Sequence, residues 1–220
     1  MHDQRRVMGG DRYPGYDVLA KWSGPSWNAK TRQVIARRLA IAPEPRFFTA
    51  AEFETVTAIA ARIVPQPAAR PPIPVAALVD LKLHEGVMDG YRSAGTPRDG
   101  EAWRLGLKAL DAEARMAYRD RFAALADGLQ VTLLQRAEAG DLHASEWGAM
   151  SPRDFFKKRL ARDIVLAYYA HPIAWSEIGW GGPASPRGYV RLDFNERDPW
   201  EAAEAHGDDA SARRMNSRVR

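Results

Sequence analysis

The sequence predicts an all-α fold, a compact bundle of about six helices with an extended aromatic N-terminal arm and a long Trp/Gly-rich C-terminal loop. Two observations predict it. Several segments repeat apolar residues three and four positions apart, which is the period of an amphipathic helix. Two segments also begin with the spacing of a capping box, Thr49 to Glu52 and Ser151 to Asp154. Long helices with defined starts are therefore expected through most of the chain.

Three regions are expected along the chain. They are an extended arm over 1–28, a single helical domain over 29–200 and a charged, frayed tail over 201–220. The arm carries large aromatic side chains between glycines and prolines, so we expect it to lie across a protein surface. These side chains are Tyr13, Tyr16, Trp22 and Trp27. A short helix should follow, capped by Asn28 or Thr31.

The clearest predicted helix begins after Thr49, and its apolar residues recur at helical spacing to form one buried face. They are Phe53, Val56, Ile59, Ala60 and Ile63. The five prolines between residues 65 and 74 predict a stiff, polyproline-like connector. Pro74 suits the first turn of a further helix, and Gly86 is expected to end that helix.

A polar loop is predicted over residues 87–100, followed by helices around Trp103–Leu110 and Leu129–Arg136. The longest helix should begin after Ser151 and end at His171, because the residue before a proline disfavours the helical region. Its predicted buried stripe consists of Phe155, Phe156, Leu160, Ile164, Val165, Tyr168 and Tyr169.

The segment over residues 171–194 is the most informative part of the chain, because it combines large aromatic side chains with glycines and has no helical period. It reads HPIAWSEIGWGGPASPRGYVRLDF. Two interpretations stay open: its tryptophans cover the ends of the helices as a lid, or they bind a partner protein. The candidate interface residues are Trp175, Trp180, Tyr189, Tyr169, Trp22 and Trp27.

We expect no catalytic, cofactor-binding or metal-ligating residue in this chain. With no cysteine, disulfides and thiolate sites are excluded, and the five histidines share no ligand spacing. The glycines of Gly179–Gly182 do not lie between a strand and a helix, so we interpret them as turns that let bulky neighbours pack. Asp163 is expected to pair with Arg159 or another arginine, and His171 to bond a nearby carbonyl at a helix end.

The charge and the hydropathy of the sequence indicate which kinds of partner and which cellular locations are expected. A formal charge of +4, scattered along the chain, does not favour a nucleic-acid partner. No run reaches the roughly 18 apolar residues of a membrane span, so no direct membrane insertion is expected. Arg5-Arg6 is not followed by an apolar stretch, so we expect no signal peptide. The location is then either the cytoplasm or, by co-export with a partner, the periplasm.

Several stretches occur in an order that resembles the gluconate 2-dehydrogenase subunit 3 family, over roughly residues 46–190. They are FFTAAEFETVTAIAARIVPQ, then GLKALDAEAR…FAALADG…LLQRAEAGD, then FF…AYYAHP and IGWGGPASPRGY. The resemblance implies a small, non-catalytic subunit of a bacterial dehydrogenase complex. Its partner would be a large flavoprotein of the glucose-methanol-choline oxidoreductase type that holds FAD, often joined by a cytochrome c. The subunit would assist maturation, stability or export.

Two other functions remain open. The first is a stand-alone α-helical enzyme that uses Asp163, His171 or Glu177 in a pocket beneath the aromatic loop. A deep cleft lined by these residues would favour it. The second is a nucleic-acid binder, which would require one contiguous basic face.

Overall fold

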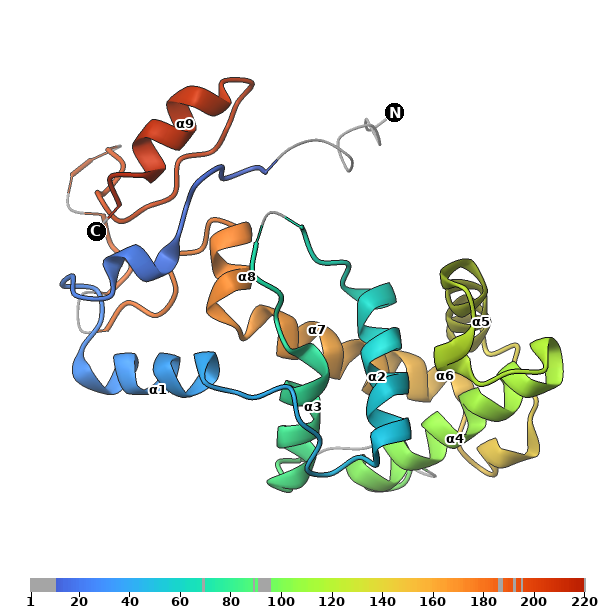
Figure 1. The fold of residues 1–220 in the computed structure, drawn as a ribbon. Helices are drawn as coiled ribbons and strands as arrows, with labels where there is room; N and C mark the ends of the chain where they lie inside the picture. Colours follow the sequence, from blue (N-terminus) through green and yellow to red (C-terminus); the bar gives the residue numbers. More distant parts are fainter. Residues whose placement is uncertain are drawn as a thin grey trace. The chain divides into compact units, whose positions relative to one another are not determined.

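The computed structural model describes residues 11–68, 70–88, 90, 96–185, 188–191, 193–194 and 196–219 (Figure 1). Helices dominate these residues, and the only strand-like pairing among them is one isolated bridge between Trp27 and Ser185. The predicted all-α fold is therefore confirmed. The Arg5-Arg6 pair lies outside the described residues.

The chain forms two compact units, which we describe separately. The central unit is Ile41–Tyr168, and the terminal unit combines the N-terminal part up to Ala40 with the C-terminal part from Tyr169. This division differs from the expected single domain over 29–200, because the arm and the tail pack against each other. Asn216 shows the pairing, since its side-chain Nδ2 donates to the carbonyls of Pro14 and Ala203, each at 3.0 Å.

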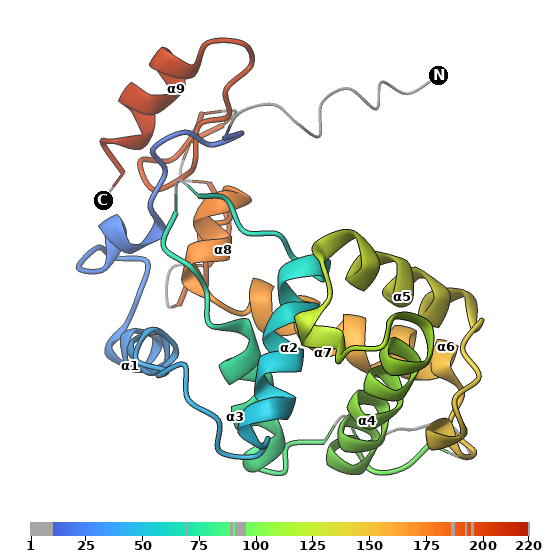
Figure 2. The same ribbon diagram turned by 45° about the vertical axis from the view of Figure 1, so that its right-hand side comes forward.

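The central unit holds most of the helices. They are α2 (Ala50–Ile63), α3 (Val75–His84), α4 (Asp99–Tyr118), α5 (Asp127–Ala139), α6 (Pro152–Phe155) and α7 (Ala161–Tyr169), the last ending one residue beyond the unit boundary. Short 3₁₀ turns lie at Phe122–Ala124 and Ser145–Trp147. Figures 1 and 2 both show α2 and α3 side by side.

Local capping places the start of α2 and the end of α3 as predicted. The Thr49 amide donates to the Glu52 carboxylate at 2.8 Å, and the Glu52 amide donates to Thr49 Oγ1 at 3.3 Å, which completes the capping box. Gly86 has a φ of +66°, and the amide of Val87 reaches back to the carbonyl of Lys82 at 3.1 Å. This glycine-dependent Schellman arrangement ends α3.

The helix expected between Ser151 and His171 is interrupted by a π-turn over Phe156–Leu160. A π-turn holds more residues than an α-turn, so it rotates the side chains that follow it. The predicted buried stripe is wrong at two positions, because Val165 and Tyr169 are exposed while Ile164 and Tyr168 are buried.

The terminal unit contains the 3₁₀ turn η2 (Val18–Lys21) and the helices α1 (Ala29–Leu39), α8 (Pro172–Glu177) and α9 (Asp209–Asn216). Two of these helices correct the sequence interpretation. The segment over 171–194 begins with α8, and the tail, expected to be frayed, forms α9 with Asp208 as its cap. The core of the terminal unit consists of Tyr16, Val18, Trp27, Ile35, Trp175 and Val219.

Candidate functional site

The glycines of Gly179–Gly182 bring the segment into close contact with aromatic rings of the terminal unit. At Gly182, with a φ of +68°, an added Cβ would lie 2.9 Å from Trp175 Cε3 and 3.3 Å from Trp27 Cζ2. At Gly179, with a φ of +69°, it would lie 2.5 Å from ring atoms of Tyr13. The interpretation of these glycines as turns that let bulky neighbours pack is confirmed.

Trp175 and Trp27 are core residues of the terminal unit, with only 1% and 2% of their surfaces exposed. Trp175 Nε1 donates to the Tyr169 carbonyl at 2.7 Å, and the Arg38 guanidinium lies 5.8 Å from the Trp175 ring centroid. This burial corrects their assignment as interface candidates, because a side chain enclosed in its own unit offers no free surface.

Trp22 is half-buried and packs edge-on against Trp27, with the ring centroids 5.9 Å apart. It therefore belongs mainly to the same core.

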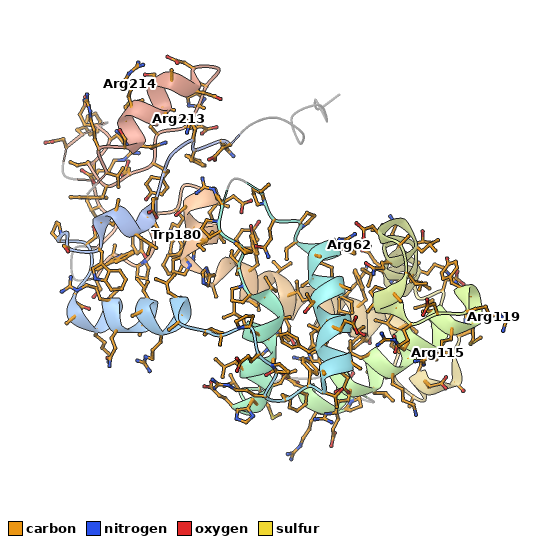
Figure 3. All side chains as sticks on the ribbon, viewed as in Figure 1. Arg62, Arg115, Arg119, Trp180, Arg213 and Arg214 are labelled. Atoms are coloured by element: carbon orange, nitrogen blue, oxygen red, sulfur yellow. The ribbon has the colours of Figure 1, made fainter. Side chains whose placement is uncertain are left out.

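The other three candidates reach the surface. Trp180 is 39% exposed, Tyr169 43% and Tyr189 67%. Figure 3 labels Trp180. The Trp180 ring stands edge-on against buried Trp175, with centroids 4.9 Å apart, so the core holds it in place. Phe194 and Val190, which are not among the sequence candidates, are more exposed still.

A cavity of about 310 Å³ opens beside Trp180 and Tyr189. Aromatic rings and the glycine run form one part of the cavity wall, and a charged pair forms another part. Its lining consists of Tyr13, Gly179–Gly182, Tyr189, Arg191 and Trp200–Ala202. Arg191 Nε lies 3.0 and 3.1 Å from the two carboxylate oxygens of Glu201, and Arg191 Nη2 lies 2.9 Å from Glu201 Oε2, which together make a bidentate contact.

Asp163 lies in a buried polar network of the central unit rather than in a cleft. Its Oδ1 accepts a hydrogen bond from Lys82 Nζ and its Oδ2 accepts one from Trp103 Nε1, both at 2.8 Å. Arg159 stands 3.7 Å from Asp163 and bonds Asp99 at 2.8 Å. The expected pairing of Asp163 with Arg159 is confirmed, and both carboxylate oxygens serve the packing of helices.

His171 is the N-cap of α8 rather than a helix-terminal donor, because its Nδ1 accepts from the Ile173 amide at 3.4 Å. Burial, and to a smaller extent the nearby Arg38 charge, lowers the pKa of His171 to about 4. The imidazole of His171 is therefore neutral at pH 7 and has a structural role. Glu177, at the end of α8, is half-buried.

The residues of the enzyme alternative are not gathered in a described cavity. Asp163 belongs to the central unit, whereas His171 and Glu177 belong to the terminal unit. Besides the 310 Å³ cavity, the central unit has cavities of about 350 Å³ near the start of α4 and about 570 Å³ along α2 and the proline connector. None of these three is lined by Asp163, His171 or Glu177.

Metal-site and membrane-span features are also absent from the described ranges. Within them, no three His, Cys, Asp or Glu side chains come together as a metal site. No helix there has both the length and the apolar character needed to cross a membrane.

Comparison with known proteins gives one match. The family model described as gluconate 2-dehydrogenase subunit 3 matches residues 50–182, which is more than half of the chain. No curated protein and no solved structure matches. The matched region begins at the first residue of α2, runs through α8 and ends at Gly182 in the glycine run. The chain belongs to the gluconate 2-dehydrogenase subunit 3 family.

Proposed function

We propose that this chain is the non-catalytic small subunit of a dehydrogenase complex. It binds a large flavoprotein of the glucose-methanol-choline type and supports the maturation, stability or export of that flavoprotein. FAD and the substrate site belong to the large subunit, and a cytochrome c is a further partner of the complex. The observation that carries the proposal is membership of a family that is named as a subunit of a dehydrogenase.

The exposed aromatic side chains of the terminal unit support the proposal. Tyrosine and tryptophan are enriched where protein surfaces meet, because they bury a large area while losing little conformational entropy. Trp180 and Tyr189 are both exposed, and the Trp180 ring packs against the buried ring of Trp175. We assign the docking surface to Trp180, Tyr189 and Tyr169.

Co-expression tests the proposal. The large flavoprotein subunit is produced with and without this chain, and its soluble yield, bound FAD and dye-coupled dehydrogenase activity are measured. We expect all three to be higher with the chain present. If the flavoprotein is equally soluble, flavin-loaded and active alone, the proposed function is wrong.

A pair of variants tests whether the support given to the flavoprotein depends on the docking surface. Trp180→Ala combined with Tyr189→Ala removes two exposed aromatic side chains from the docking surface, whereas Met116→Ala removes an exposed apolar side chain of α4 in the central unit. The double variant should lose most of the support given to the flavoprotein, and the Met116 variant should keep it.

A further inference from the structure

We propose that the N-terminal arm and the C-terminal tail position the docking surface, by holding the glycine run Gly179–Gly182 that carries Trp180. The inference rests on the proposed function, since it concerns how the chain presents Trp180 to the large subunit. The family match does not assign this role, because the arm and the tail both lie outside the matched residues 50–182.

The arm packs against both ends of the glycine run. At Gly179 an added Cβ would lie 2.5 Å from ring atoms of Tyr13, and at Gly182 it would lie 3.3 Å from Trp27 Cζ2. Both glycines have a positive φ, so the backbone of the run is one that other residues rarely adopt. Trp180 therefore stands between two points at which rings of the arm lie directly on the backbone.

The arm is also hydrogen-bonded to the chain on both sides of the glycine run. Before the run, the Val18 amide donates to Ser176 Oγ at 3.0 Å. After the run, the Asn28 amide donates to the Ser185 carbonyl at 2.9 Å. A segment that is already held in one conformation loses less entropy when it binds a partner. The arm therefore prepares the run that carries Trp180 for docking.

The tail holds the arm through a buried amide. Asn216 Nδ2 donates to the carbonyls of Pro14 and Ala203, each at 3.0 Å, and the Ala203 amide donates to Asn216 Oδ1 at 2.7 Å. The Ala205 amide also donates to the Arg12 carbonyl at 2.9 Å. The Asn216 side chain thus ties the tail to the arm, and through the arm it acts on the glycine run.

The residues that hold the arm are not those that reach the surface. Asn216 is 2% exposed, so it offers no surface to a partner, whereas Trp180 and Tyr189 are exposed. A change at Asn216 can therefore affect docking only through the arm and the glycine run. A loss of stability by itself leaves the dissociation constant almost unchanged while nearly all of the chain stays folded. Affinity thus separates a positioning role from a purely structural one.

The first test uses the free chain. The indole N–H resonance of Trp180, assigned by loss of its peak in Trp180→Phe, is compared by NMR between the wild type and Asn216→Ala. The Trp175 ring, whose centroid is 4.9 Å from that of Trp180, makes this resonance sensitive to the conformation of the glycine run. We expect the resonance to shift in Asn216→Ala. An unchanged resonance in the folded variant overturns the proposal.

Gln130→Ala is the matched control, because Gln130 is a buried amide of the central unit that also donates to backbone carbonyls. Its Nε2 donates to the carbonyls of Phe122 and Leu125 at 3.2 and 3.0 Å. This variant should melt at a lower temperature but keep the Trp180 resonance. A Trp180 shift of the same size in Gln130→Ala would show that the resonance reports general destabilisation, which also overturns the proposal.

A second variant decides the matter if Asn216→Ala does not fold. Tyr16→Phe keeps the ring of the arm and removes the phenol that donates to the Trp200 carbonyl at 3.3 Å, just before the tail. We expect a smaller Trp180 shift in the same direction, with the fold checked by thermal melting. No shift in this variant contradicts the positioning role.

The second test uses the complex. The dissociation constant for the large flavoprotein subunit is measured for the wild type, Asn216→Ala and Gln130→Ala, at a temperature where melting shows each chain to be folded. We expect about tenfold weaker binding for Asn216→Ala, which lies within the usual range of coupling between two sites. We expect no change for Gln130→Ala.

The outcomes separate the two claims. If the wild-type chain does not bind the flavoprotein, the proposed function fails, and the positioning role, which rests on it, fails with it. If the wild type binds and folded Asn216→Ala binds equally tightly, the positioning role alone is overturned.

Discussion

At the scale of single residues, Gly182 and Trp175 depend on each other. Gly182 adopts a left-handed backbone, and the Trp175 ring occupies the space a Cβ would need. The sequence was enough to interpret these glycines as packing turns, because a glycine beside tryptophans has few other uses. The sequence did not show that Trp175 is buried and Trp180 exposed, because the burial of each tryptophan depends on contacts with aromatic rings of the distant arm.

Replacing Gly182 with alanine should destabilise the terminal unit by about 2–5 kcal/mol, the sum of left-handed backbone strain and overpacking. Gly207→Ala is the control, because Gly207 has a φ of +88° and nothing within 4 Å of an added Cβ. That change should cost only about 1–2 kcal/mol. Chemical denaturation followed by tryptophan fluorescence measures both. Equal losses would show that Trp175 and Trp27 do not crowd the site.

His171 should make the terminal unit sensitive to acid. Its pKa is about 4 in the folded chain and about 6.5 when unfolded, so the unfolded chain takes up the proton first. Stability from this group is complete above about pH 6.5 and falls as the pH is lowered towards 4, by an upper limit of roughly 3 kcal/mol.

Asparagine at position 171 keeps a cap for α8 but does not titrate. His171→Asn should therefore flatten the part of the stability profile between pH 6.5 and 4, measured by urea denaturation at a series of pH values. An unchanged profile would assign the acid sensitivity to other groups.

At the scale of elements, helix starts were the most predictable features. Asn28, Thr49 and Ser151 each cap the helix that was expected after them, because capping is a local interaction of adjacent residues. The π-turn at Phe156–Leu160 was not predicted, since neither apolar spacing nor capping residues distinguish it from a continuous α-helix. Helix α8 was missed because Pro172 was interpreted only as a helix end, whereas it is also suited to a first turn.

The network around Asp163 joins three helices, with Lys82 on α3, Trp103 on α4 and Asp163 on α7. Asp163→Asn keeps the volume but removes the negative charge that Lys82 Nζ contacts at 2.8 Å, which should cost about 2–4 kcal/mol. Lys158→Ala breaks an exposed pair with Asp154 and should cost less than about 0.5 kcal/mol. Thermal unfolding compares the two. Similar losses would mean that the network contributes no more than a surface pair.

At the scale of the whole molecule, the arm and the tail form one unit although they stand at opposite ends of the chain. The bond from Asn216 to Pro14 spans 202 positions, and no local pattern predicts such a contact. The family match, in contrast, was visible in the sequence, because the motifs of the central region lie close together along the chain. The proposed docking surface combines both, with Trp180 inside the matched region and Tyr189 outside it.

Binding between purified subunits tests the central claim most directly. The chain and the flavin-loaded large subunit are mixed and passed over a size-exclusion column with light scattering and flavin absorbance recorded together. We predict one species that contains both chains, carries the flavin signal and has a mass equal to their sum. Two separate peaks at the masses of the free subunits, at micromolar concentrations, would contradict the assignment of this chain as a subunit of the complex.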